Sequence, residues 1–173
     1  MATPRREIWR EARYAIAVHQ VQTRGGGLVE RACIDHPGAV VIWAQDAAGR
    51  VAVIDNQRWT VGERLLELPA GTLHPGEAPE AGAHRELAEE TGLRAAALTA
   101  LGSYYLAPGS SNERMWAFLA TDVTPGPTAL DADEDLSMRW MTLAELDAAI
   151  ARGEVRNANL LAVRSLVRVR AGR

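Results

Sequence analysis

The sequence has little of several features that mark common classes of protein. Cys33 is the only cysteine in the 173 residues, so an intrachain disulfide is impossible and a reducing compartment is expected. The longest apolar run, Ala39 to Ala44, is far too short to span a bilayer. Residues 1–13 are charged and lack the apolar core of a secretory signal. We therefore expect a cytoplasmic protein without a membrane partner.

The chain also lacks an excess of basic residues and has few aromatic side chains. The chain has 19 basic and 22 acidic residues, a net charge of −3, which argues against a nucleic-acid partner. Aromatic residues make up 5% of the chain, so few side chains can stack on a nucleobase. Trp9, Trp59 and Tyr104 are the candidates, and the sequence does not show which base they would select.

What is present indicates one α/β domain with a small N-terminal appendage. Apolar residues make up 47% of the chain, enough for a substantial core. Strand patterns cover residues 14–23, 28–34, 39–45, 51–56, 95–106, 114–121 and 138–141. Helical patterns cover residues 78–91, 142–152 and 157–169, the second opening on a capping box of Thr142 and Glu145. Residues 1–11 are polar and expected to be loosely held, and residues 57–64 are expected to form a loop.

These patterns predict a fold class and a division of the chain. Strands that alternate loosely with helices favour a mixed sheet covered by helices on both faces, an α/β/α sandwich. Before it, the first two strands and the glycine turn between them predict a β hairpin. We expect residues 1–37 to form this N-terminal β region and residues 38–173 to form the main domain.

The most informative stretch runs from Gly71 to Leu93. A turn at Pro75-Gly76 precedes its helix, and Gly92 is placed to end that helix. On the helix, Glu86, Glu89 and Glu90 share one face. Their negative charges repel one another and lie near the helix C-terminus, where the macrodipole disfavours anions. A divalent cation such as Mg²⁺ removes this conflict, because it takes carboxylate oxygens as ligands.

The same stretch resembles a known motif. Gly71, Glu77 and the run Arg85-Glu86-Leu87-Ala88-Glu89-Glu90-Thr91-Gly92-Leu93 fill every fixed position of the Nudix box at its spacing. The resemblance implies the Nudix α/β/α fold. It also implies Mg²⁺-dependent hydrolysis of the pyrophosphate bond in a nucleoside diphosphate linked to another moiety, with Mn²⁺ as a possible substitute.

Outside the box, the chain is similar to the ADP-ribose and ADP-sugar pyrophosphatase branch. The run Leu66 to Gly71, the Pro108-Gly109 loop and the pair Trp140-Met141 carry this likeness. It implies ADP-ribose as the substrate, with AMP and ribose 5-phosphate as products. It also implies a homodimer in which the N-terminal region is exchanged between subunits.

The resemblance assigns roles to individual residues. Glu86, Glu89, Glu90 and the carbonyl oxygen of Ala70 would be metal ligands. Arg85 and Glu77 would hold the loop against the helix. Arg58 would face phosphate, while Gly109 and Glu113 would lie at the terminal ribose.

Two positions depart from the branch. Asp55 stands where an arginine is common, and an acid there would repel phosphate. Ala132 falls at the usual position of the catalytic glutamate, and alanine cannot accept a proton. Glu134 matches the next, metal-associated glutamate and is the first candidate for the base, followed by Glu89. Asp131 and Asp133 are further candidates.

Other functions stay open at this point. Another nucleoside diphosphate-sugar, such as GDP-mannose, or a dinucleotide would suit the same box. A catalytically weak module that binds ADP-ribose as a sensor would account for Ala132.

Overall fold

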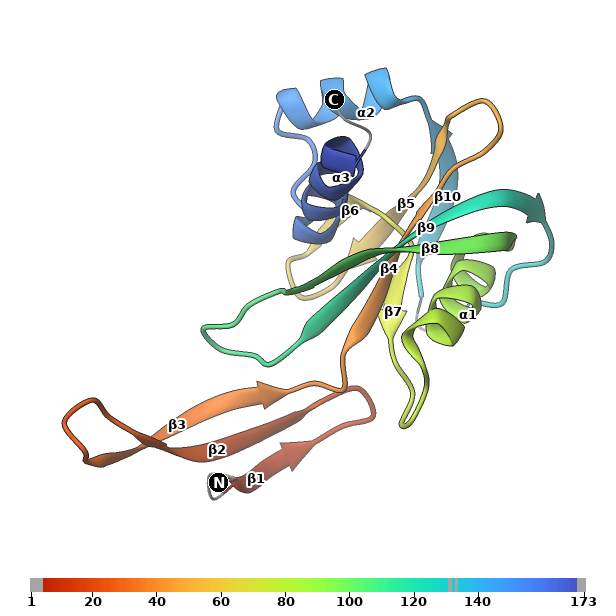
Figure 1. Cartoon of the computed structure of the whole chain (residues 1–173). Helices are drawn as coiled ribbons and strands as arrows, with labels where there is room; N and C mark the ends of the chain where they lie inside the picture. Colours follow the sequence, from red (N-terminus) through yellow and green to blue (C-terminus); the bar gives the residue numbers. More distant parts are fainter. Residues whose placement is uncertain (1–4, 131, 133, 171–173) are drawn as a thin grey trace.

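The computed structural model describes residues 5–130, 132 and 134–170, and its strands form three sheets. The first is the N-terminal sheet, in the order β1-β2-β3, and it lies beside the rest of the molecule (Figure 1). Its antiparallel strands are β1 (Arg5–Arg10), β2 (Ala15–Gln22) and β3 (Leu28–Asp35). The predicted hairpin of β2 and β3 is thus confirmed, with one strand added to it.

The prediction that residues 1–11 are loosely held is wrong for the part of this segment that the structure describes. Residues Arg5 to Arg10 pair with β2 in antiparallel register, with an irregularity between Glu7 and Trp9. All six residues of β1 are exposed. A strand that buries neither face shows no alternation of apolar and polar residues, so its sequence carries no strand pattern.

The body of the molecule is built on two further sheets. The larger is mixed, in the order β7-β4-β9-β8, with β4 and β9 parallel and the outer pairs antiparallel. Its strands are β4 (Ala39–Ala44), β7 (Ala70–Thr72), β8 (Leu93–Tyr105) and β9 (Arg114–Pro125). The smaller is antiparallel, in the order β10-β5-β6, and comprises β5 (Val51–Arg58), β6 (Glu63–Glu67) and β10 (Leu136–Met141).

Three helices cover these sheets from two sides (Figure 1). Helix α1 (Pro79–Thr91) lies on one side, and α2 (Leu143–Ala151) and α3 (Ala158–Arg170) lie on the other. Strand β4 is buried along its whole length. Val40 and Ile42 pack with Leu87 of α1, and Val41 and Trp43 pack toward α2 and α3. The α/β/α sandwich expected from the sequence is therefore present.

The predicted loop at residues 57–64 is wrong at both ends. Strand β5 continues to Arg58, and β6 begins at Glu63, so the turn between them is confined to residues 59–62. Hydrogen bonding between β5 and β6 sustains these polar ends, and the polar residues themselves show no strand pattern in the sequence.

The ends of the helices follow the sequence signals. Pro79 occupies the first turn of α1, and Gly92 ends the helix at φ 71°, with its N–H bonded to the Ala88 carbonyl. The capping box of Thr142 and Glu145 is present at the start of α2. In the part of the chain that is described, no helix has both the length and the apolar character needed to cross a membrane.

Candidate active site

Three carboxylates of α1 gather on the side that faces the sheets. Glu86 and Glu90 are buried, with 8% and 4% of their surface exposed, while the Glu89 side chain is 38% exposed. Burying a negative charge is costly unless a positive charge or hydrogen-bond donors compensate for it. The spacing in the sequence thus predicted a shared face correctly, and folding places much of that face out of water.

The local electrostatics show a shortage of positive charge. Burial raises the pKa of Glu90 well above its usual value, and the nearby Glu86 and Glu134 carboxylates add to this rise. The N–H of Ala70, which donates to Glu90 Oε2 at 2.8 Å, opposes it. Burial likewise raises the pKa of Glu86, against the influence of Arg85. Oxygen ligands grouped in this way, with too little compensating charge, suit a hard divalent cation.

Arg85 connects the loop before α1 to the helix. Its Nε and Nη2 donate to the two oxygens of Glu77 at 2.9 and 2.8 Å. Its Nη1 donates to Glu86 at 2.6 Å and to Glu89 at 2.9 Å, and Nη2 also reaches the Thr72 carbonyl at 3.0 Å. The hydrogen bonds from Arg85 lower the pKa of Glu77 to about 2. This geometry matches the bracing that the sequence assigned to Arg85 and Glu77.

Gly71 allows the loop and helix to approach closely. A Cβ atom at this position would lie 2.0 Å from Oε1 of Glu86, a distance that no side chain tolerates. The N–H of the neighbouring Ala70 donates to Glu90, as described above. Two of the predicted metal ligands, Ala70 and Glu90, therefore lie side by side. At Gly71, the backbone of β7 therefore lies directly against the Glu86 side chain of α1.

Arg58 faces the same acidic group from β5. Its guanidinium makes a bidentate pair with Glu67, at 2.9 Å from Nε and 2.5 Å from Nη2. This pair raises the pKa of Arg58, and the carboxylates of Glu90 and Glu134 raise it further. The sequence singled out Arg58 but not Glu67, which is only 2% exposed. The only local signal for Glu67 was an acid between the apolar residues Leu66 and Leu68, four residues before the box begins at Gly71.

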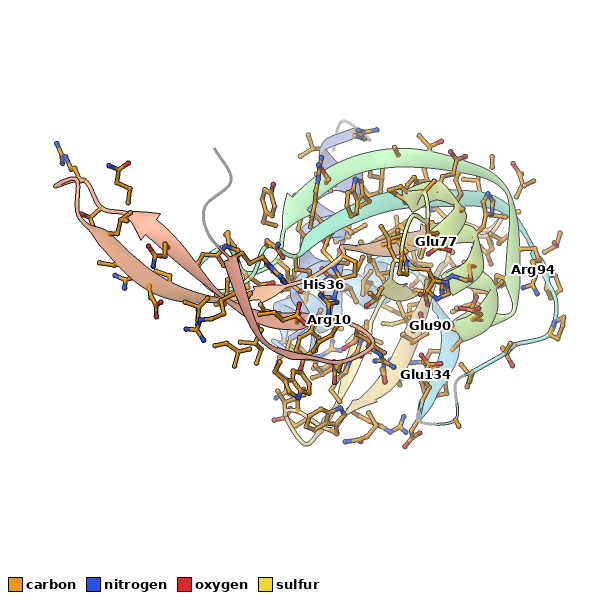
Figure 2. The ribbon with its side chains drawn as sticks, turned by 90° about the horizontal axis from the view of Figure 1, so that it is seen from below. Arg10, His36, Glu77, Glu90, Arg94 and Glu134 are labelled. Atoms are coloured by element: carbon orange, nitrogen blue, oxygen red, sulfur yellow. The ribbon has the colours of Figure 1, made fainter. Side chains whose placement is uncertain are left out.

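Glu134 reaches this group from the acidic loop before β10. Figure 2 shows it beside Glu90, and its charge contributes to the raised pKa values of both Glu86 and Glu90. Ala132 is exposed on a turn. Asp131 and Asp133 lie outside the described residues. Among the acids of this loop that the structure describes, Glu134 is therefore the one placed to act together with α1.

The loop that carries Glu134 is attached at two places. On one side the N–H of Ala129 donates to the Glu89 carbonyl at 3.0 Å. On the other side the Asp135 carbonyl accepts from the N–H of Gln57 at 2.9 Å, and the Asp135 side chain pairs with Arg64. These contacts fix the chain on both sides of Glu134 and direct Asp135 toward Arg64.

Asp55, the first departure from the branch, has a basic partner of its own. Side chains alternate along β5, so Asp55 lies on the face of Val51 and Val53, which pack toward α2 and α3. Its Oδ2 accepts a hydrogen bond from Arg139 at 2.8 Å. Arg58, three residues later, lies on the opposite face. The two-residue period of the strand thus separates Asp55 from Arg58, the residue expected to face phosphate.

Gly109 and Glu113 belong to a second loop, which joins β8 to β9 and packs on β3. Ile34 exchanges backbone hydrogen bonds with this loop, donating to Ser110 at 2.9 Å and accepting from Asn112 at 3.2 Å. Oε1 of Glu113 lies 4.0 Å from Nε2 of His36. A Cβ atom at Gly109 would meet nothing within 4 Å. The loop is thus anchored to the N-terminal sheet, and its predicted contact with substrate remains a prediction.

Comparisons with known proteins agree with this arrangement. Residues 35–163 match the model of the NUDIX domain family. The ADP-ribose pyrophosphatase of Mycobacterium tuberculosis (strain ATCC 25618 / H37Rv) is 40% identical over 152 residues, which span 86% of this chain and 73% of that protein. The ADP-ribose pyrophosphatase of Bacillus subtilis (strain 168) is 34% identical over 143 residues, 82% of this chain and 77% of that protein. A crystal structure of an ADP compounds hydrolase superposes with a TM-score of 0.78 at 23% identity over 95% of this chain and 90% of that one, which shows a shared fold.

Proposed function

The chain belongs to the NUDIX domain family, and on that premise we propose that it hydrolyses the pyrophosphate bond of ADP-ribose to give AMP and ribose 5-phosphate. The observation that carries this proposal is the group of buried carboxylates on α1, joined by Arg58 and Glu134. The two bacterial relatives, both ADP-ribose pyrophosphatases, favour ADP-ribose over other nucleoside diphosphate-sugars.

A divalent cation, Mg²⁺ or Mn²⁺, fits the ligands present. Glu86, Glu89, Glu90, Glu134 and the carbonyl oxygen of Ala70 would hold it, and each is an oxygen donor of the kind that hard cations prefer. When bound, the ion supplies charge neutralisation at the pyrophosphate and acidifies a water molecule.

The residues of the chain then have separate tasks. Glu134 accepts the proton of the attacking water, with Glu89 as the second candidate because its side chain is more exposed than those of Glu86 and Glu90. Arg85 and Glu77 keep the loop and helix in register. Arg58 is held by Glu67 through Nε and Nη2, and the exposed remainder of its guanidinium binds phosphate. Gly109 and Glu113 contact the terminal ribose.

We also propose that two copies of the chain associate through the N-terminal region, residues 1–37, and leave residues 38–173 as the catalytic domain. The N-terminal sheet exposes large apolar side chains, among them Leu28 at 66%, Ile8 at 56% and Trp9 at 47%. Apolar surface gathered on a small sheet is typical of a protein interface. The cytoplasmic location expected from the sequence stays a prediction.

The test is a panel of ADP-ribose, GDP-mannose and a dinucleotide, each incubated with the protein and Mg²⁺, with the products separated by chromatography. We expect release of AMP from ADP-ribose to exceed turnover of the other compounds, and to stop when EDTA removes the metal. If another compound of the panel is hydrolysed faster, that compound replaces ADP-ribose as the proposed substrate. Tight binding of ADP-ribose without turnover would support the sensor instead.

A further inference from the structure

Three potential metal ligands of different types come together in the N-terminal sheet, away from the α1 carboxylates. They are His19 on β2 and Cys33 and Asp35 on the adjacent β3. One ligand atom from each residue lies within 4.8 Å of the other two. In the antiparallel register, Ala17 stands opposite Cys33 and Ala15 opposite Asp35. These small partners leave room for the imidazole of His19 to extend over them toward the other two ligands.

The imidazole of His19 has an unsatisfied nitrogen. Its Nε2 is shielded from solvent and forms no hydrogen bond with any residue that the structure describes. Oδ1 of Asp35 lies 3.5 Å away from this nitrogen. A buried polar atom without a partner is costly, and in native proteins it often marks a site for a bound water or ion. Here the unpaired nitrogen lies near a carboxylate oxygen, and the Cys33 thiol belongs to the same group of potential ligands.

Asp35 is already oriented by groups outside the three ligands. Its Oδ2 is bonded to Nε of Arg5, and its Oδ1 accepts a hydrogen bond from Asn112 Nδ2 at 3.2 Å. Outer hydrogen bonds of this kind orient the carboxylates that bind metals. Nη2 of Arg5 also donates to Glu7 at 3.2 Å, so Asp35 is not the only carboxylate that balances the charge of Arg5. A thiolate from Cys33 and the carboxylate of Asp35 can then balance the charge of a divalent ion.

We propose that His19, Cys33 and Asp35 form a second metal site, for an ion of the zinc class. Imidazole nitrogen and thiolate sulfur favour Zn²⁺ over Mg²⁺, so this site differs in ligand chemistry from the carboxylates of α1. With three protein ligands, a fourth position stays open to water. The side chains of His19 and Asp35 are 25% and 17% exposed, which gives the ion a route in.

A metal ion here would stabilise a region that has little core of its own. Ala15 and Ala17 are the only buried hydrophobic residues of the described part of the N-terminal sheet. Small units without a sufficient core commonly depend on a metal, a disulfide or association. The hydrogen bond from Asn112 to Asp35 also links the site to the loop that carries Glu113. An ion bound at Asp35 would therefore hold the sheet, this loop and the body of the molecule together.

The single thiol of the chain allows a direct test with Co²⁺, a spectroscopic substitute for Zn²⁺. Tag-free, reduced protein is titrated with Co²⁺ in excess Mg²⁺, which occupies the carboxylates of α1. A thiolate bound to Co²⁺ gives a near-ultraviolet charge-transfer band, and only Cys33 can produce it. We expect the band to saturate at about one Co²⁺ per chain and to disappear when an equivalent of Zn²⁺ is added.

Matched variants distinguish a metal site that uses His19 as well as Cys33 from a thiol that binds Co²⁺ by itself. We expect Cys33→Ser to abolish the band, and His19→Gln to weaken Co²⁺ binding by about tenfold or more, since each removes a ligand. Zn²⁺ should raise the melting temperature of the wild type and leave that of Cys33→Ser unchanged. Glu80→Gln, an exposed change on α1, should retain the band. Absence of the band in the wild type, or equal affinity in His19→Gln, would overturn the proposal. Neither result depends on whether ADP-ribose is hydrolysed.

Discussion

In the segment from Gly71 to Leu93, Arg85 donates hydrogen bonds to three carboxylates and a carbonyl. In the N-terminal sheet, by contrast, the apolar side chains of Leu28, Ile8 and Trp9 are exposed to solvent. In the first region, the loop and the helix are joined by hydrogen bonds between charged groups, and the buried carboxylates that remain suit a metal ion. The second exposes apolar surface and leaves a histidine nitrogen without a hydrogen bond. The carboxylate group on α1 thus forms within one chain, while the N-terminal sheet is the region for which we propose a second copy and a metal ion.

The two regions also anchor different groups of predicted site residues. The α1 carboxylates are fixed by Ala70, Arg85 and the anchored loop of Glu134. The loop with Glu113 is fixed by β3. Substrate selection would therefore depend on the N-terminal sheet, and bond cleavage on the box.

The largest effect is expected from Glu90→Gln, which tests whether the box provides the chemistry. Turnover of ADP-ribose should fall by about 100-fold or more, because phosphoryl transfer depends on metal positioning and charge neutralisation. Steady-state rates of AMP release at saturating Mg²⁺ measure this fall. The fold should survive, since the amide oxygen of glutamine can still accept the N–H of Ala70.

Glu80→Gln is the matched control for this substitution. It makes the same chemical change on the same helix at an exposed position, so wild-type turnover is expected. Mg²⁺ should raise the melting temperature of the control and of the wild type but not that of Glu90→Gln. Near-normal turnover in Glu90→Gln would remove Glu90 from the metal site.

Glu77→Gln tests whether the loop and helix are held by charge. Arg85 lowers the pKa of Glu77 from 4.5 in the unfolded chain to about 2 in the folded protein. The full stabilisation by this ion pair is therefore present only above about pH 4.5. This stabilisation is lost as the pH falls from about 4.5 to about 2. At neutral pH the substitution should lower the free energy of unfolding by about 2 kcal/mol.

Urea unfolding at a series of pH values measures this difference. The gap between Glu77→Gln and the wild type should close toward the acid end of the series, while Glu80→Gln should stay within about 0.5 kcal/mol throughout. A gap that is the same at every pH would show that packing, not charge, holds the loop.

How far the sequence predicts the molecule also differs between the two regions. In the box, local signals are sufficient: Pro79 and Gly92 bound the helix, and the spacing of Glu86, Glu89 and Glu90 gives the shared face. The partner of Arg58 was missed, because Glu67 is nine residues away and meets it only through pairing of β5 with β6. A contact between side chains of two paired strands leaves no periodicity in the sequence to detect.

In the N-terminal region, local signals fail for a different reason. Strand β1 buries nothing within one chain, so burial imposes no pattern on residues 5–10. The group of His19, Cys33 and Asp35 likewise arises from the register of β2 against β3, with fourteen and sixteen residues separating the histidine from its partners. For Asp55, the alternation of the predicted strand is a sufficient local signal, because it already places this residue on the face opposite Arg58.

The smallest effect is expected from Trp9→Ser, which tests whether a second copy covers the N-terminal sheet. Trp9 is 47% exposed and packs against Tyr14 with ring centroids 5.9 Å apart, so a partner would bury only part of its surface. The dimer should weaken by about fivefold, or about 1 kcal/mol, in sedimentation measurements over a range of concentrations. Val169→Ser removes a side chain that is 75% exposed on α3, on the far side of the body from this sheet, and should leave association unchanged. A wild-type protein that sediments as a monomer at all concentrations would leave the metal ion as the remaining support for this sheet.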